Sequence, residues 1–143
     1  PMATNDAGMR VNIITPDGTV FSEDGVDLVV ARALDGEFGI MRDHAPLVAA
    51  LKVWPIRIKK DGKEIVIAVF GGFMEVKDNV VTITSRVAET ADYIDIERAI
   101  KARDRALSRL ESKDKNIDYE RAELALQRAL IRLQVAGATK LKS

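Results

Sequence analysis

The sequence lacks the residues that several kinds of reactive site require. Its 143 residues contain no cysteine and a single histidine, His44. Disulfides and thiolate metal sites are therefore excluded, and neither a histidine-rich metal site nor a Ser-His-Asp triad is expected. No run of about 18 apolar residues is present, so the sequence predicts no membrane-spanning helix. The first residues, PMATNDAG, lack the basic-then-apolar order of a signal peptide, and none is expected.

An excess of either charge is also missing. The 22 basic residues balance the 22 acidic residues, whereas proteins that bind duplex nucleic acid usually carry a clear basic excess. We therefore expect no nucleic-acid partner, and any anion site must be local. The chain has the length of one ordinary domain or two very small ones, and its hydrophobic fraction of 47% is enough for a folded core.

The chain changes its hydrophobic period near Tyr93. Before that point, short β-branched runs alternate with turn pairs such as Asp61-Gly62 and Asp78-Asn79, which predicts an antiparallel sandwich or barrel. Gly71-Gly72 interrupts one of these strands. We interpret this pair as a bulge or a close approach of two backbones, because no helix start with Lys-Ser/Thr follows it.

Beyond Tyr93 the apolar residues recur at helical spacing. Asp95 is placed to cap a first helix, residues 112–116 (SKDKN) form a polar break, and Asp118 is placed to cap a second helix that runs to about Ala136. So short a break predicts two antiparallel neighbours, a helical hairpin. Alanine is abundant along the expected seam and buries little area, so the hairpin should be loosely held. The apolar side of the second helix is expected to comprise Leu126, Leu130 and Leu133 with Ala122, Ala125 and Ala129.

Two similar segments of the expected hairpin carry arginines at matching positions. Residues 98–110 (RAIKARDRALSRL) and 121–133 (RAELALQRALIRL) fit one template, and offsets of 7 and 11 return to nearly the same side of a helix. Antiparallel pairing gathers four arginines at the end remote from the turn: Arg98, Arg105, Arg128 and Arg132. Such a cluster is unfavourable unless carboxylates, water and salt, or a phosphate relieve it. A solvated face is the commoner explanation of an arginine stripe. With Ile94 as an apolar surface and Asp95 as an acceptor, however, the arrangement is also a chemically sensible nucleotide pocket.

Three blocks of the sequence resemble the epsilon subunit of bacterial rotary (F-type) ATP synthases. These are DGEFGIMRDHAPLVAAL (35–51), GGFMEVKDNVVTI (71–83) and YIDIERA (93–99) followed by RAELALQRALIRL. The resemblance covers about 10 to 136. It implies an α+β fold, with an antiparallel β-sandwich of about ten strands over 9–92 and an antiparallel two-helix hairpin over 93–137.

The resemblance implies a non-catalytic rotor subunit of the central stalk. Its sandwich would bind the gamma subunit and the ring of c subunits, which places it peripherally at the cytoplasmic face of the cell membrane. Its hairpin would alternate between a compact state against the sandwich and an extended state among the alpha and beta subunits, where it inhibits ATP hydrolysis. In Bacillus-type members ATP, with or without Mg²⁺, is a regulatory ligand that holds the compact state.

The site residues that the resemblance implies fall on matching positions. Ile94 and Asp95 would meet the adenosine part, with Glu89 near the base, and Ala99 completes the I-D-x-x-R-A motif. The phosphates would contact Arg98, Arg105, Arg128 and Arg132. The contact with the c-ring would use Glu37, Arg42 and His44, although Arg42-Asp43 stands where the family usually has Pro-Gly. No catalytic residue and no metal site is expected.

Two other functions remain as alternatives. One is a free-standing nucleotide-sensing binding module without a rotor role, which copurification with the gamma subunit would exclude. The other is a helical hairpin that binds nucleic acid. Residues 94–136 contain ten basic and eight acidic residues, and this small difference argues against it.

Overall fold

The computed structural model describes residues 8–142, with side chains described as far as Gly137. The N-terminal PMATNDA, for which no signal peptide is expected, lies outside the described residues. The strands are β1 (Met9–Thr15), β2 (Gly18–Val26), β3 (Leu28–Ala33), β4 (Gly36–Ile40), β5 (Leu47–Lys60), β6 (Lys63–Lys77), β7 (Val80–Thr84) and β8 (Ala88–Thr90). A 3₁₀ turn, η1 (Ala91–Tyr93), leads into α1 (Ile96–Glu111) and α2 (Tyr119–Lys142).

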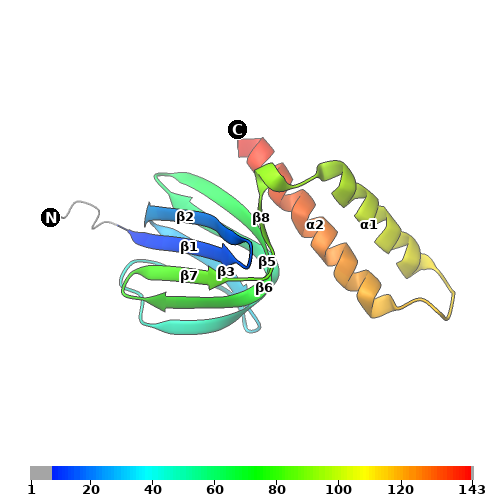
Figure 1. Cartoon of the computed structure of the whole chain (residues 1–143), viewed down its shortest axis with the longest axis horizontal. Helices are drawn as coiled ribbons and strands as arrows, with labels where there is room; N and C mark the ends of the chain where they lie inside the picture. The colour runs from blue at the N-terminus through cyan, green and yellow to red at the C-terminus, as the bar shows by residue number, and fades with distance from the viewer. Residues whose placement is uncertain (1–7, 143) are drawn as a thin grey trace.

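The strands wrap around one apolar core (Figure 1). Their order is β2-β1-β7-β6-β5-β3-β4, and β8 pairs with β6 off this path. The predicted β-sandwich followed by two helices is confirmed, although β1 and β7 pair in parallel whereas the other ladders are antiparallel. The described residues contain eight strands rather than about ten. The count is lower because β5 and β6 are long, with 14 and 15 residues, and each is one continuous strand.

Gly72 lies where β6 exchanges one partner for another. Residues 67–69 in the middle of β6 pair with β8, and residues 73–77 at its end pair with β7. Gly72 has a φ of +116°, and a Cβ added there would lie 2.1 Å from the carbonyl oxygen of Thr84. The predicted close approach of two backbones is therefore confirmed. The expected tight turn also forms, because Asp61 and Gly62 both have positive φ between β5 and β6, as a two-residue hairpin turn requires.

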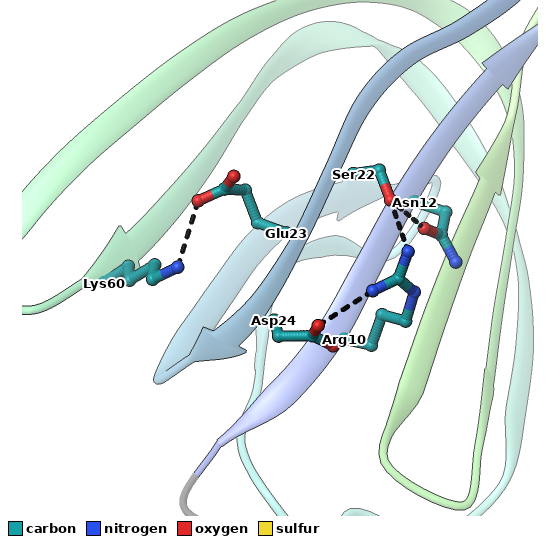
Figure 2. A network of polar contacts seen from close by, with 6 residues as sticks. All are labelled: Arg10, Asn12, Ser22, Glu23, Asp24 and Lys60. Atoms are coloured by element: carbon teal, nitrogen blue, oxygen red, sulfur yellow. Dashed lines mark hydrogen bonds and ion pairs between the residues drawn. The ribbon is translucent and has the colours of Figure 1, made fainter. Parts of the chain in front are cut away.

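A polar network fastens the edge strand β2 to its neighbours (Figure 2). Arg10 on β1 donates to Ser22 Oγ at 2.8 Å and lies 3.0 Å from the carboxylate of Asp24. Lys60 on β5 donates to Glu23 at 3.0 Å. This hydrogen bond raises the pKa of Lys60 above its ordinary value, although desolvation acts in the opposite direction. The network therefore stabilises the sandwich without involving the hairpin.

Both helices begin at the predicted caps. The Asp95 carboxylate accepts a hydrogen bond from the backbone N–H of Arg98 at 3.0 Å, and the Asp118 carboxylate accepts one from Arg121 at 3.1 Å. Each bond satisfies a backbone donor that the first turn leaves unpaired. The second helix continues past its predicted end near Ala136 to Lys142. Gly137 lies within the helix and has no positive φ, so it does not act as a C-terminal cap.

The second helix lies between the sandwich and the first helix (Figure 1). Its Ile131 and Val135 join Val66 and Ala68 of β6 in a second apolar cluster. The expected burial of Leu130 is wrong, because this side chain is 47% exposed. Packing against β6 turns Ile131 inward, and its neighbour Leu130 consequently points outward. The seam between the helices is made of alanine, as predicted: Ala99, Ala106, Ala122 and Ala129 are buried.

Candidate functional site

A pocket of about 430 Å³ opens between the two helices at the end of the hairpin remote from its turn. This volume lies within the range of small-molecule sites. The lining residues come from β8, η1 and its flank, α1 and α2: Glu89, Tyr93, Asp95, Arg98, Ala99, Ala102, Arg105, Ala125, Arg128 and Arg132. Because neither helix forms the pocket alone, the cavity requires the antiparallel pairing of both.

The structure brings all four arginines of the predicted cluster together. Two of them project from α1 and two from α2, and all four line the pocket. Arg109 and Arg121 belong to the same two stripes but are not among the lining residues. The spacing of the two segments therefore gives one cationic pocket, assembled from half of each segment.

Arg132 is the arginine that ties the hairpin to the sandwich. Its Nε lies 2.8 Å and its Nη2 3.3 Å from the two carboxylate oxygens of Glu89 on β8. Its guanidinium also lies 4.6 Å from the ring centroid of Phe70 on β6. Both partners of the ion pair are partly buried, which strengthens the pair relative to one in open solvent. Glu89 is thus engaged with a cation inside the pocket.

The other three arginines of the pocket have no carboxylate partner among the residues whose side chains are described. In the part of the chain whose side chains are described, Arg98, Arg105 and Arg128 form no ion pair. The nearby carboxylate of Asp104 lies 3.0 Å from Arg103 instead, and one oxygen of Asp95 is occupied in capping α1. Three like charges around one cavity favour the binding of an anion, and guanidinium groups suit phosphate oxygens.

The apolar part of the pocket differs from the sequence-based expectation. Ile94 is only 8% exposed and packs in the apolar cluster below the hairpin, so it does not line the pocket. Asp95 and Ala99 of the same motif do line it. Tyr93, one residue earlier, lines the pocket and is 82% exposed. Sequence reasoning missed Tyr93. The signal that could have indicated it is an aromatic residue directly before the I-D-x-x-R-A motif.

The residues expected at the c-ring contact separate into two places. Glu37 and His44 line a groove of about 550 Å³ at the edge of the sandwich. Glu37 also lies 3.4 Å from Arg57. Arg42 lines a different, smaller pocket of about 220 Å³ and lies 3.9 Å from the carboxylate of Asp43. The structure therefore gathers two of the three expected residues.

Exposed apolar side chains accompany the groove of Glu37 and His44. Leu34 and Val48 line it, and both are largely exposed. Phe73, also exposed, pairs with Ala50 two residues beyond Val48, so it stands on the same face of the sheet. Patches of exposed apolar residues often mark surfaces that bind another protein.

Two further properties concern the described residues as a whole. Among them, no cluster of three or more histidine, cysteine, aspartate or glutamate side chains is arranged to hold a metal ion. None of their helices combines the length and the apolar character that crossing a membrane requires.

Known proteins share this combination of a β-sandwich and a helical hairpin. The β-sandwich domain of the ATP synthase delta/epsilon chain matches residues 8–91, and its long α-helix domain matches residues 92–137. These two matches define the class as the delta/epsilon chains of ATP synthases. The chain belongs, more particularly, to the ATP synthase epsilon chain family in its bacterial, Bacillus-type form, which confirms the resemblance seen in the sequence.

The relatives span most of the chain. The ATP synthase epsilon chain of Bacillus subtilis is 53% identical over 129 residues, which cover 90% of this chain and 97% of that relative. That of Desulforamulus reducens is 52% identical over 104 residues, covering 73% and 78%. A chain in a structure of the Euglena gracilis mitochondrial ATP synthase (OSCP/F1/c-ring) superposes with a TM-score of 0.75 at 25% identity, covering 95% of this chain and 85% of that one.

Proposed function

We propose that this chain is a rotor subunit in the central stalk of a proton-translocating ATP synthase and that ATP regulates it through the pocket between its helices. The regulatory part rests on three guanidinium groups, those of Arg98, Arg105 and Arg128. They face one cavity and have no carboxylate partner among the described side chains. A triphosphate supplies the missing negative charge. Arg132, which Glu89 already neutralises, closes one side of the same cavity.

The pocket couples ligand binding to the compact placement of the hairpin. Its walls come from both helices and from Glu89 on the sandwich, so separating the helices from each other or from β8 dismantles it. ATP therefore binds the compact state and not the extended one. A ligand that binds one state stabilises it by RT ln(1 + [ATP]/Kd), about 2.7 kcal/mol at a hundredfold excess over Kd. This free energy shifts the population toward the compact state.

The weak packing of the hairpin makes such a shift feasible. The first helix buries Ala99 and Ala106 as its only described core residues, and alanine contributes little apolar area. When ATP is scarce, the hairpin leaves the sandwich, and its arginines meet acidic surfaces of the alpha and beta subunits, where the hairpin inhibits ATP hydrolysis. The chain itself binds ATP without hydrolysing it, since its sequence contains neither a Walker motif nor an evident water-activating group.

The sandwich supplies the permanent attachments of the subunit. The exposed apolar residues Leu34, Val48 and Phe73 support a contact with the gamma subunit and the c-ring near Glu37 and His44. The relative in the Euglena gracilis assembly is part of a complex that contains F1 and the c-ring, which is in keeping with this placement. In a bacterium the subunit would lie peripherally at the cytoplasmic face of the cell membrane.

Thermal unfolding of the isolated protein with and without ATP tests the nucleotide site. ATP should raise the melting temperature of the wild type, and Arg98→Gln or Arg128→Gln should abolish most of this increase. Arg109→Gln is the matched control, because Arg109 occupies the same helix stripe outside the pocket and its substitution should leave the increase intact. The proposal fails if ATP has no effect, or if all three variants respond like the wild type.

Copurification with the gamma subunit tests the rotor assignment separately. The wild type should form a stable complex with gamma, and Val48→Glu, which places a charge on the exposed apolar face, should weaken that complex. If the wild type does not copurify with gamma, the result supports the alternative, a free-standing nucleotide-sensing module.

A further inference from the structure

Tyr93 occupies an unusual place for a large aromatic side chain. It ends η1, two residues before the capping Asp95, and it is 82% exposed although it lines the arginine pocket. It also lines a neighbouring cavity of about 580 Å³ that the β1–β2 turn and Arg86 border. Tyr93 therefore stands between two hollows, next to the cationic cluster.

We propose that the ring of Tyr93 is the stacking surface for the base of the bound nucleotide, and thus the residue that makes the pocket prefer a nucleotide over a bare polyphosphate. This inference rests on the nucleotide site proposed above. It assigns to Tyr93 the role that the sequence pattern assigns to Ile94, whose side chain is buried in the cluster with Ile131 and Val135.

The remaining lining residues offer no second aromatic surface for a base. Among the described residues that line the pocket, Tyr93 is the one aromatic side chain. The uncharged floor consists of Ala99, Ala102 and Ala125, which make room for a ligand but offer no π-face. The other side chains are charged and suit phosphate, ribose hydroxyl or amino groups. A planar base gains most by stacking on an aromatic ring.

The location of Tyr93 fits a nucleotide whose base lies at one end of the pocket and whose phosphates lie at the other. Tyr93 lies two residues before Asp95, which caps α1, and the pocket arginines of α1 extend from Arg98 in its first turn to Arg105, about two turns further along. A triphosphate that extends from Arg98 toward Arg105 leaves its nucleoside at the beginning of α1. There the ring of Tyr93 can contact the base, and the free oxygen of Asp95 can accept a hydrogen bond from an amino or hydroxyl group.

Calorimetric titration with ATP and with inorganic tripolyphosphate tests this role. Tyr93→Ala should raise the Kd for ATP about tenfold, because losing one base–aromatic stack typically has an effect of this order. Tyr93→Phe, which keeps the ring, should stay within about twofold of the wild type. The Kd for tripolyphosphate, which has no base, should be the same in all three proteins. Because the side chain is exposed, the melting temperature without ligand should not change.

Each contrary result has a separate meaning. If Tyr93→Ala binds ATP like the wild type while Arg128→Gln binds it more weakly, the nucleotide site stands and the stacking role is refuted. If Tyr93→Ala weakens tripolyphosphate as much as ATP, Tyr93 acts on the shape of the pocket and the stacking role is again refuted. If the wild type binds neither ligand, the proposed nucleotide site fails, and this inference fails with it.

Discussion

The ion pair between Glu89 and Arg132 should hold the hairpin against the sandwich when no nucleotide is bound. Two hydrogen bonds, 2.8 and 3.3 Å long, join side chains that are 26% and 29% exposed. Fully exposed pairs contribute about 0.2–1 kcal/mol, and hydrogen bonds to charged groups contribute about 1.5–3 kcal/mol. For this half-buried bidentate pair we expect a coupling energy of about 1–2 kcal/mol.

A double-mutant cycle measures that coupling energy. Glu89→Gln, Arg132→Met and the double variant are unfolded with denaturant in the absence of ATP, and the interaction free energy is taken from the cycle. In the single variants, amide hydrogen exchange should accelerate in α2 more than in β1 or β7, because the pair fastens α2. Lys60→Met is the matched control: it breaks a comparable 3.0 Å pair with Glu23 inside the sandwich. A coupling below about 0.3 kcal/mol, the usual error of such cycles, would refute the reasoning.

Two further predictions concern other parts of the structure. Gly72→Ala should destabilise the sandwich by about 3 kcal/mol in denaturant unfolding, because its Cβ would lie 2.1 Å from the Thr84 carbonyl oxygen. Gly18→Ala has a similar φ but open space around it, so a loss as large as that of Gly72→Ala would contradict the steric explanation. Asp95→Asn should keep the cap of α1 and Asp95→Ala should lose about 1 kcal/mol of stability. If Asp95 also contacts the ligand, both variants should weaken ATP binding in calorimetry, and unchanged binding in Asp95→Asn would exclude that contact.

The features predicted from sequence are those that local patterns determine. Aspartate caps and a polar break locate the helices, and antiparallel pairing across a short turn then fixes which arginines meet. The same holds for Gly72 and for the Asp61-Gly62 turn, since both depend on backbone conformations that few residues adopt. The alanine seam follows from the helical period in the same way.

The features missed depend on contacts between distant segments. The rotation of α2 is set by how Ile131 fits against β6, so the helical period alone does not show that Leu130 faces outward. Glu89 precedes Arg132 by 43 residues, and only the docking of α2 on the sandwich brings them together. The same docking buries Ile94 and leaves Tyr93 at the pocket.

The central claim, that ATP shifts the hairpin toward its compact placement, is most directly tested by a distance measurement across that movement. Because the chain contains no cysteine, Lys63→Cys on the sandwich and Ser108→Cys on α1 accept two spin labels without further changes. Double electron–electron resonance on the labelled subunit in the reconstituted ATP synthase should show that the population at the label distance of the compact placement grows with ATP, and Arg128→Gln should abolish this growth. A distance distribution that ATP leaves unchanged, or an ATP response that survives Arg128→Gln, would contradict the claim.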